Sequence, residues 1–286
     1  MSLRNEVAKL YVRLVFRDDG PFDPIDTQSK LNRPLPPKSI ALRCEPLEAD
    51  VGPGFWVDKQ NSDRGVLLYL HGGAFYFGPV KEHWQYLAGI CRRTRMSGIM
   101  LDYGLAPQNP YPAGMEQIMT AARFLSDKGS WAILGDSSGA AMAVSTATAL
   151  ALEGRPLPAR LVLMSPWTDL TLANPAIKLT ENDDVMMTVE RLSNAAEAYA
   201  GTAERASADL SPMFGELNRL PPALIQTGTA DLLLWDCRKF YLKCLDAGVS
   251  VVYEEYPGAF HDFMMLSFLP ETKRALSTQA DFLAAK

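Results

Sequence analysis

Residues 131–152 read WAILGDSSGAAMAVSTATALAL: a short apolar run, a turn of small residues and a long helix-forming stretch. This order predicts a buried strand that turns sharply into a helix. Gly135 and Gly139 supply the small neighbours that a sharp turn needs, and Ser137 stands centrally between them. Ser138 is a second serine in this turn, but its position is not central.

The G-x-S-x-G pattern between a strand and a helix predicts that Ser137 is a nucleophile. The strained turn would hold the serine oxygen clear of the sheet. The helix N-terminus beneath it would place free N–H groups near developing negative charge. The alternative is an ordinary glycine-rich turn with a capping serine.

Short apolar strands alternate with helices along much of the chain. We expect strands at 66–70, 99–102, 132–134, 161–164, 223–227 and 249–254, and helices at 82–94, 115–127, 138–152, 234–247 and 271–285. Most of these strands are continuous apolar runs, which is typical of strands covered on both faces. The alternation predicts an α/β fold with a parallel sheet, whose active site lies at the carboxyl ends of the strands.

The composition excludes several classes of protein. The chain has 286 residues, 48% of them hydrophobic and 21% charged, which suits one large domain or one domain with a small appendage. Its net charge of −5 leaves no basic surplus for phosphates and argues against nucleic acid as a partner. The four cysteines form no C-x-x-C pair and only three histidines are present, so we expect no metal site.

The N-terminal residues 1–16 differ from a signal peptide because charged residues interrupt them. Apolar residues recur there at helical spacing and predict an amphipathic helix: Leu3, Val7, Leu10 and Leu14. The longest uncharged run, residues 137–152, is too short and too polar to cross a membrane. We therefore expect a soluble, cytoplasmic protein with buried thiols and no membrane span.

Two segments differ in amino-acid composition from the rest of the chain. Residues 18–54 are rich in proline and are expected to form an irregular connection. Residues 168–215 are polar and mixed, with a predicted helix at 189–200.

The sequence HGGAF at 71–75 follows the strand at 66–70. Consecutive glycines leave backbone N–H groups unshielded, and an acyl-transfer intermediate needs two or three such donors at its oxygen. We predict that the N–H groups of Gly72, Gly73 and Ser138 form this oxyanion hole. A plain Gly-Gly turn is the alternative.

Three histidines are candidates for the base that would take the proton of Ser137. His71 already lies in the glycine loop. His83 lies within a predicted helix, where a structural or pocket-lining role is expected. By elimination we predict His261, just past the last strand, as the base; a loop histidine without a catalytic role is the alternative.

The third member of a triad must accept a hydrogen bond from His261 and fix its tautomer. We predict Asp231, which lies just after the strand at 223–227. Asp236 is the alternative and is expected to face outward in the first turn of the next helix. Asp262 adjoins the histidine and is poorly placed to orient it.

These residues resemble the hormone-sensitive-lipase-like branch of the α/β-hydrolases, the bacterial carboxylesterase group. The resemblance runs from about residue 66 to the C-terminus. It includes, in the same order, HGGAF at 71–75, DYGLAPQNPYPA at 102–113, GDSSGA at 135–140, SPWTDL at 165–170, SPMF…LPP at 211–222, GTAD at 228–231 and YPGAFHDF at 256–263. The chain order serine, aspartate, histidine is also that of the α/β-hydrolases.

The resemblance implies an α/β-hydrolase fold with a mostly parallel, eight-stranded sheet flanked by helices and a small helical cap. Residues 1–45 would form the N-terminal part of the cap. Residues 46–286 would form the catalytic domain, with a second cap segment at about 170–210. The implied function is a serine carboxylesterase that cleaves short- to medium-chain acyl esters without a metal or cofactor. The resemblance also leaves room for a homodimer formed through the edge of the sheet.

Several positions depart from the family pattern. Ala74 stands where the family usually has a third glycine, and Gly104 and Gln108 stand where it usually has arginine and glutamate. Because both members of the latter pair are missing, we infer that a structural ion pair has been lost as a unit. Ser138 and Ala140 likewise replace alanine and glycine.

A substrate pocket is expected among large side chains in or beside the site loops and the cap: Phe75, Tyr76, Trp84, Met186, Phe214 and Phe260. For most of them a place in the core is the alternative. A lactone or amide hydrolase could use the same triad. A non-catalytic ligand-binding protein on this fold is a further alternative, which the presence of His261 argues against.

Overall fold

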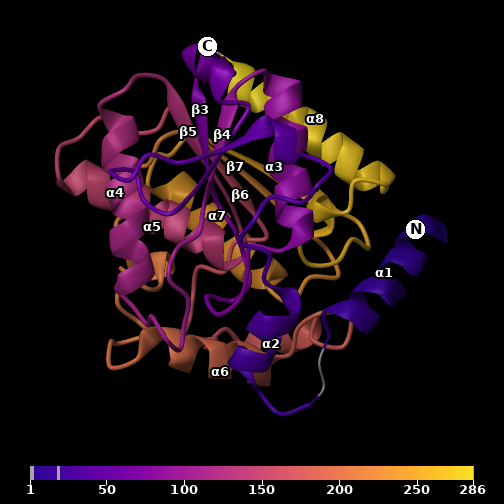
Figure 1. The fold of residues 1–286 in the computed structure, drawn as a ribbon. Coiled ribbons are helices and arrows are strands. Elements are labelled where there is room, and N and C mark those ends of the chain that lie inside the picture. Colours follow the sequence, from indigo (N-terminus) through magenta and orange to yellow (C-terminus); the bar gives the residue numbers. More distant parts are fainter. Residues whose placement is uncertain (1–2, 18–19, 286) are drawn as a thin grey trace.

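An eight-stranded sheet forms the centre of the structure, a computed structural model that describes residues 3–17 and 20–285 (Figure 1). The strand order is β1-β2-β4-β3-β5-β6-β7-β8. Strand β2 pairs antiparallel with β1 and β4, and every other neighbouring pair is parallel, which confirms the predicted mostly parallel sheet. The strands are β1 (Cys44–Pro46), β2 (Gly54–Val57), β3 (Val66–Leu70), β4 (Ser97–Leu101), β5 (Trp131–Asp136), β6 (Leu161–Met164), β7 (Ala223–Gly228) and β8 (Val251–Tyr256).

Helices cover both faces of this sheet (Figure 1). Two of them pack together on one face: α3 (Lys81–Thr94) and α8 (Pro270–Ala284). Three cover the other face: α4 (Ala113–Ser126), α5 (Ser138–Leu152) and α7 (Leu234–Asp246). These five helices agree closely with the predicted ranges. Four of them are amphipathic, whereas α5 is apolar and buried on nearly all sides.

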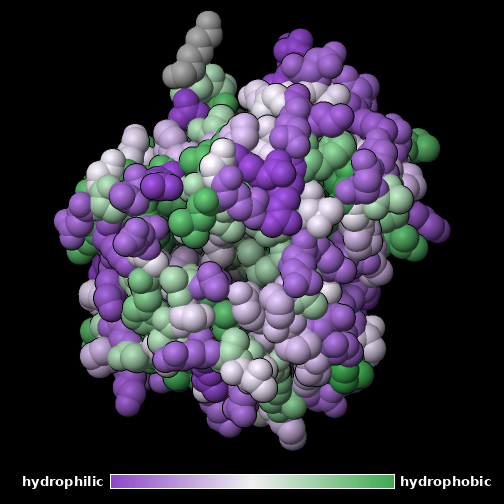
Figure 2. Space-filling model, turned by 90° about the vertical axis from the view of Figure 1, so that its left-hand side faces the viewer, coloured by the Kyte–Doolittle hydropathy of each residue, from purple (hydrophilic) through white to green (hydrophobic). Residues whose placement is uncertain are grey.

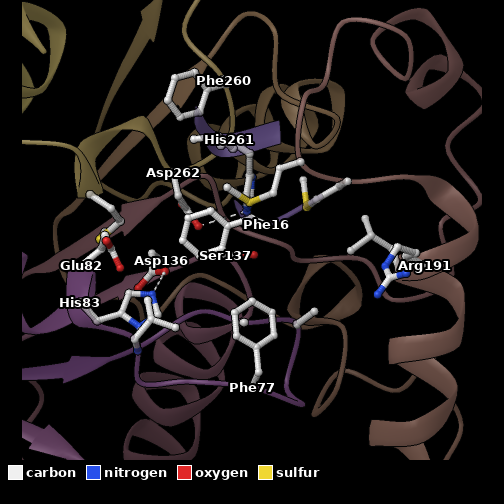
Figure 3. A pocket seen from close by; sticks show the side chains of 18 of the residues that line it. Phe16, Phe77, Glu82, His83, Asp136, Ser137, Arg191, Phe260, His261 and Asp262 are labelled. Carbon is white, nitrogen blue, oxygen red and sulfur yellow. Dashed lines mark hydrogen bonds and ion pairs between the residues drawn. The ribbon is translucent and has the colours of Figure 1, made fainter. Parts of the chain in front are cut away.

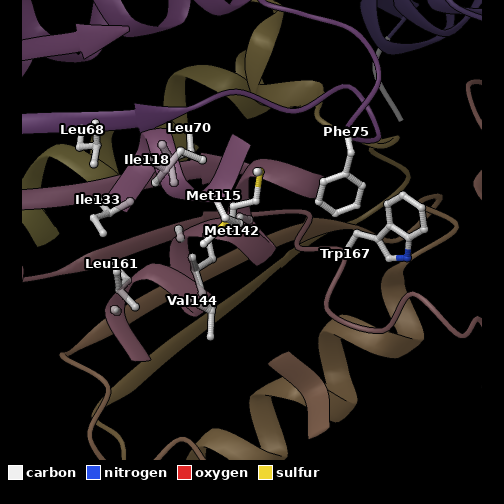
Figure 4. Close-up of a cluster of buried hydrophobic side chains, with 14 of the residues drawn as sticks. Leu68, Leu70, Phe75, Met115, Ile118, Ile133, Met142, Val144, Leu161 and Trp167 are labelled. Carbon is white, nitrogen blue, oxygen red and sulfur yellow. The ribbon is translucent and has the colours of Figure 1, made fainter. Parts of the chain in front are cut away.

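The central strands contribute side chains to a separate core on each face. In β3, Leu68 and Leu70 join the cluster beneath α4 and α5, part of which is drawn in Figure 4. Leu67 and Tyr69 join the cluster beneath α3 and α8. Successive side chains of a strand point to opposite faces, so a strand buried on both faces must be apolar throughout.

The segment 18–54 is more regular than the sequence suggested. It contains α2 (Pro24–Leu31), β1 and the start of β2. Asp23 caps α2 by accepting a hydrogen bond from the backbone N–H of Asp26, and Pro24 occupies the first turn, where its missing N–H costs nothing. The prediction of a wholly irregular connection is therefore wrong.

The N-terminal helix is present as α1 (Leu3–Val15), but the apolar stripe identified in the sequence is not its buried face. Val7, Leu10 and Leu14 are 60%, 60% and 75% exposed. Ala8 and Val12 are buried instead. Ala8 and Val12 are four positions apart, so they lie on one side of the helix and face the rest of the molecule.

Two segments far apart in the sequence contact one another at the end of the molecule that holds α2 and α6 (Val189–Ala200) (Figure 1). The guanidinium of Arg17 donates to the carbonyl oxygen of Asp184 at 3.0 Å, and that of Arg191 donates to the carbonyl oxygen of Gly20 at 3.2 Å. These residues fall within the segments 1–45 and 170–210 that were expected to form the cap.

On the face shown in Figure 2, hydrophobic side chains lie scattered among hydrophilic ones. None of the described helices combines the length and apolar character that crossing a membrane requires.

Candidate active site

Ser137 occupies a strained turn between β5 and α5. Its φ is 51° and its ψ is −119°, a conformation that non-glycine residues rarely adopt. The turn is held by flanking hydrogen bonds: the N–H of Ser137 donates to Met164 at 2.8 Å, and its carbonyl accepts from Trp167 at 3.1 Å. Backbone strain of this kind persists only where the surroundings enforce it, and it is concentrated at functional sites.

The two glycines of the turn are required by space. A Cβ atom on Gly135 would lie 2.5 Å from the carbonyl oxygen of Gly139. A Cβ on Gly139 would lie 2.0 Å from the carbonyl oxygen of Leu70 in β3. Any side chain at either position would therefore push α5 away from the sheet and move Ser137.

Asp231 and His261 meet in the loops that follow β7 and β8. The Nδ1 atom of His261 lies 3.1 Å from both carboxylate oxygens of Asp231. The carboxylate of Asp231 also accepts from the backbone N–H of Leu233 at 2.8 Å and from the hydroxyl of Thr227 at 3.2 Å. The Asp231 side chain is thereby fixed in a position to orient the imidazole.

Burial opposes ionisation of Asp231, but the charge of His261 and the hydrogen bonds to the carboxylate outweigh it and lower the pKa of Asp231. Burial likewise opposes protonation of His261. The adjacent carboxylates of Asp262 and Asp231 outweigh that effect and raise the pKa of His261 well above its usual value. The two neighbouring carboxylates therefore favour the charged form of the imidazole over the neutral one.

Asp262 lies at the other nitrogen of the same imidazole. Its Oδ2 atom is 3.1 Å from Nε2 of His261 (Figure 3). Among the described residues, the hydroxyl of Ser137 makes no hydrogen bond, although Ser137 and His261 line the same cavity. Asp262 was expected to be poorly placed to orient the histidine because it adjoins it in sequence; its carboxylate instead contacts the Nε2 edge of the ring, opposite Asp231.

The loop after β3 carries two of the three residues expected to form the oxyanion hole, Gly72 and Gly73, and the third, Ser138, begins α5. Gly73 lines the cavity beside Ser137 and has φ +117°, which favours glycine. Within the described chain, the N–H groups of Gly72 and Gly73 donate to no acceptor. The N–H of Ser138 is the first of α5 and so has no intrahelical partner. Buried N–H groups rarely stay unpaired, so these three donors are suited to a ligand oxygen.

His71 packs inside the molecule against the loop that follows β3. It is fully buried, stacks on Tyr103 with ring centroids 4.4 Å apart, and its Nδ1 lies 2.8 Å from the carbonyl oxygen of Gly72. Burial lowers the pKa of His71 to about 3, which keeps its imidazole neutral. The histidine therefore fixes the loop and has no free charge to offer the reaction.

A second polar group lies beneath the nucleophile. The carboxylate of Asp136 accepts from the hydroxyl of Tyr69 at 2.5 Å and lies 3.4 Å from Nε2 of His83. His83 also accepts at Nδ1 from the N–H of Val80 at 3.0 Å and lines the cavity, in line with the structural or pocket-lining role expected for it. Burial opposes ionisation of Asp136, but His83 and Tyr69 outweigh it and lower its pKa.

The cavity over Ser137 has an empty volume of about 880 Å³ including its open mouth. Figure 3 shows acidic side chains on one side of Ser137 and Arg191 on the other. Of the predicted lining residues, Tyr76, Met186 and Phe260 line this cavity. Other apolar residues complete its wall: Val12, Phe16, Phe77, Leu192, Met265 and Leu266.

Three predicted lining residues lie elsewhere. Phe75 is buried against Tyr199 and Trp167. Trp84 is buried on the inner face of α3, where its indole N–H donates to the carbonyl of Arg33 at 2.7 Å. Phe214 is 45% exposed. The prediction that these three residues line the substrate pocket is therefore wrong. A place in or beside a site loop does not determine which way a side chain points.

Sequence reasoning also missed Asp184, in the segment before α6. Its Oδ1 accepts from the N–H groups of Met186 and Met187 at 2.7 and 2.8 Å, and its Oδ2 accepts from Leu232 at 2.7 Å. One carboxylate thus ties this segment to the loop that carries Asp231. The sequence offers one local indication: Asp184 precedes Met186 and Met187 by two and three residues, the spacing at which an aspartate commonly accepts from backbone N–H groups.

Asp236 does not face outward as expected. It is 2% exposed in the first turn of α7, and its Oδ1 accepts from the side-chain amide of Asn174 at 2.7 Å. Within the described residues it neither hydrogen-bonds nor pairs with His261, and it therefore does not compete with Asp231.

The departures from the family pattern have local structural counterparts. Gln28 and Gln108 exchange side-chain amide hydrogen bonds of 3.1 and 2.9 Å, which join α2 to the loop after β4. This neutral pair includes one of the two positions at which an ion pair was inferred to be lost. Ala74 has φ 49°, a conformation in which glycine would be unstrained. Among the described residues, no three His, Cys, Asp or Glu side chains gather as metal ligands would.

Comparison with known proteins places this geometry in a family. The α/β-hydrolase fold family matches residues 67–265. An esterase of Acinetobacter venetianus is 31% identical over 252 residues, covering 86% of this chain and 83% of that protein. An acetyl-hydrolase of Streptomyces hygroscopicus is 33% identical over 233 residues, covering 80% and 78%.

Among solved structures, an esterase from the bacterial hormone-sensitive lipase family matches with a TM-score of 0.88 and 29% identity. The match covers 99% of this chain and 98% of that chain. The chain therefore belongs to the α/β-hydrolase fold family, alongside bacterial esterases of the hormone-sensitive lipase family.

Proposed function

We propose that this chain is a serine carboxylesterase that hydrolyses short- to medium-chain acyl esters through Ser137, His261 and Asp231. The observation that carries the proposal is the pairing of His261 with Asp231 at a cavity that also exposes the strained Ser137. The esterase relatives support the ester as substrate class.

In the proposed reaction, Nε2 of neutral His261 takes the hydroxyl proton as Oγ of Ser137 attacks the ester carbonyl carbon. The carbonyl oxygen becomes an oxyanion that accepts from the N–H groups of Gly72, Gly73 and Ser138. The proton on Nε2 then passes to the alkoxy oxygen, the bond from the acyl carbon to that oxygen breaks, and the alcohol leaves.

Water completes the cycle by attacking the acyl-enzyme. His261 takes its proton, and the acid leaves as Ser137 recovers its own proton from Nε2. Throughout, Asp231 holds Nδ1 and stabilises the imidazolium that forms in each step. No step of this route requires a metal or a cofactor.

The apolar wall supports an acyl group of limited length. Phe16, Phe77 and Met186 lie around the cavity over Ser137. Bulky side chains on several sides exclude water from a short acyl chain and leave restricted room for a long one. We therefore expect acetate to hexanoate esters to be cleaved faster than palmitate esters.

The test is hydrolysis of p-nitrophenyl esters from acetate to palmitate by the wild-type protein, Ser137→Ala and Ser145→Ala. Ser145 lies on α5, and its hydroxyl donates to the carbonyl of Asp209, so its replacement controls for a lost serine. Ser137→Ala should lose at least about 10⁴-fold in kcat, while Ser145→Ala should not.

The same proteins should be assayed on p-nitroanilides and γ-lactones. If the wild type cleaves only amides or lactones, the carboxylesterase proposal is wrong although the nucleophile stands. If the wild type is inert on every acyl compound, or Ser137→Ala retains its rate, the assignment of Ser137 fails.

A further inference from the structure

His261 is held by a carboxylate at each of its two ring nitrogens. Nδ1 lies 3.1 Å from Asp231, and Nε2 lies 3.1 Å from Oδ2 of Asp262. The second contact is unexpected at this position, because Nε2 is the atom that must face Ser137 for the proposed reaction. The described residues offer Ser137 no hydrogen bond in its place.

The backbone holds Asp262 in this arrangement. Its φ is 52°, in the left-handed region, and its carbonyl oxygen accepts from the N–H of Met265 at 2.9 Å. Its own N–H donates to the hydroxyl of Ser165 at 3.4 Å. A strained residue anchored on both sides points to a role for its side chain, and here the side chain reaches the imidazole.

We propose that Asp262 is a positioning residue that holds the Nε2–H of protonated His261 in the resting enzyme and thereby sets the pH at which the histidine becomes free to act as the base. This inference rests on the proposed function, in which Nε2 takes the proton of Ser137. It adds a step before that reaction: the imidazolium must release its Nε2 proton to solvent water, and the neutral ring must then turn away from the carboxylate of Asp262.

The charges around the pair favour this resting state. The groups that face it come from several elements: Asp231 after β7, Asp136 at the end of β5, Asp184 before α6, Cys237 on α7, Tyr69 on β3, and Glu82, His83 and Tyr86 on α3. Arg191 of α6 lines the far side of the cavity. Carboxylates predominate near His261, and the two in contact with its ring, Asp262 and Asp231, favour the charged imidazole over the neutral one. The two tyrosines and Cys237 stay neutral, because burial raises their pKa values well above the ordinary range.

The carboxyl group of Asp262 is harder to ionise than that of Asp231, because the pKa of Asp262 is raised and that of Asp231 is lowered. Burial raises the pKa of Asp262 to about 7, and the charge of Asp136 adds to this rise, while His261 opposes it. The Oδ1 atom of Asp262 is buried and has no hydrogen-bond partner among the described residues. Asp231, by contrast, has several donors. The contact at Nε2 is therefore the weaker of the two and is the one that can open.

The direction of the effect on activity follows from proton linkage. A base must be unprotonated, so activity rises with pH through the pKa of His261 in the free enzyme. An opposite charge within about 4–6 Å raises a histidine pKa by about one to three units. Removing the Asp262 carboxylate should therefore move the acid limb of the pH–rate profile to lower pH.

The kinetic test measures kcat/KM for p-nitrophenyl acetate against pH in the wild type, Asp262→Asn and Asp281→Asn. Asp281 is an exposed residue of α8, so its variant loses the same charge without touching His261. We expect the acid-limb midpoint to fall by about one unit or more in Asp262→Asn and to stay unchanged in Asp281→Asn. A midpoint that does not move in Asp262→Asn overturns the proposal.

A second measurement does not depend on activity. The chain has only three histidines, and the His261→Gln variant identifies the ring signals of His261 in an NMR titration. In the wild type these signals should titrate well above the ordinary histidine range and shift down in Asp262→Asn. If His261 titrates within or below that range in the wild type, the proposal is wrong, even where Asp262→Asn does not fold. A wild type without esterase activity would refute the proposed function alone, because this titration still tests the contact.

Discussion

The ring of Phe75 stacks on the ring of Tyr199, with centroids 3.9 Å apart and planes inclined by 8°. Phe75 belongs to the loop after β3 that carries the glycines, and Tyr199 belongs to α6. Trp167, which follows β6, also packs against Phe75, with its ring centroid 5.4 Å from that of Phe75. The loop beside the nucleophile and the helix over it are therefore joined by one aromatic cluster.

Replacing both partners of this stack should show that they are coupled. Phe75→Ala should lower the free energy of unfolding by about 3–5 kcal/mol, because it removes a buried aromatic ring. In a double-mutant cycle with Tyr199→Ala, urea unfolding should give a coupling of about 0.5–1.5 kcal/mol. Phe214→Ala is the control: this ring is 45% exposed, so the loss should be much smaller. A coupling near zero would show that the stack does not join loop and helix.

Two glycine-to-alanine variants should have opposite effects on stability. Gly139→Ala places Cβ 2.0 Å from the carbonyl oxygen of Leu70, so we expect loss of folding or of several kcal/mol. Gly89 lies in α3 with nothing within 4 Å of its Cβ position. Gly89→Ala should therefore stabilise the protein by about 0.5–1 kcal/mol, because alanine favours the helix. Thermal unfolding of both variants measures this, and equal effects would contradict the close-contact argument.

Asp231 and Asp236 can be separated by a matched pair of variants. Asp231→Asn should lower kcat by about 10⁴-fold, because an amide no longer fixes the tautomer of His261 or stabilises the imidazolium. Asp236→Asn should keep its activity, since Asp236 bonds to Asn174 and not to the histidine. Steady-state kinetics on p-nitrophenyl butyrate would decide this, and the reverse order of losses would exchange the two assignments.

Asp236 should also make stability depend on pH. Burial raises the pKa of Asp236 to about 6 in the folded protein, against 3.8 for the ordinary group. Below both values the carboxyl is neutral and costs nothing. Between about pH 4 and pH 6, Asp236 is ionised in the unfolded chain but still protonated in the folded protein. The free energy of unfolding therefore falls over this range as pH rises, and above it the loss stays constant.

The Asp236→Asn variant should therefore be more stable than the wild type at pH 8, by about 1–3 kcal/mol, and little different at pH 4. Urea unfolding at the two pH values measures the difference. A gain of equal size at both would show that packing, and not ionisation, is responsible.

The parts of the structure that could be predicted are those that local sequence determines. The order of apolar run, small-residue turn and helix at 131–152 predicts β5, the turn at Ser137 and α5, because each depends on neighbouring residues. The pairing of His261 with Asp231 could be anticipated because parallel strands bring their carboxyl ends to one edge.

The parts that could not be predicted depend on which distant surface a side chain meets. Val7, Leu10 and Leu14 have the spacing of a buried face, yet Ala8 and Val12 are buried instead. Nothing local distinguishes the two faces, since the choice depends on what the rest of the molecule presents to α1.

Asp262 illustrates the same limit at the site. Its position beside His261 in sequence suggested that it could not orient the ring. Its left-handed backbone conformation brings the carboxylate to Nε2 instead. One of the contacts that maintain this conformation comes from the hydroxyl of Ser165, 97 residues earlier, which no local pattern connects with Asp262.

The contact between Arg17 and Asp184 joins residues that are 167 positions apart. During synthesis on the ribosome, α1 emerges long before the segment that it will meet. Strands β1 to β6 are synthesised before Asp184 is, so this contact cannot form until most of the sheet has been made. Val7, Leu10 and Leu14 need no partner in the meantime, because they are exposed in the folded protein as well. The residues of α1 and α6 that line the cavity over Ser137 can therefore come together only after β5 and α5, which hold the nucleophile, have been made.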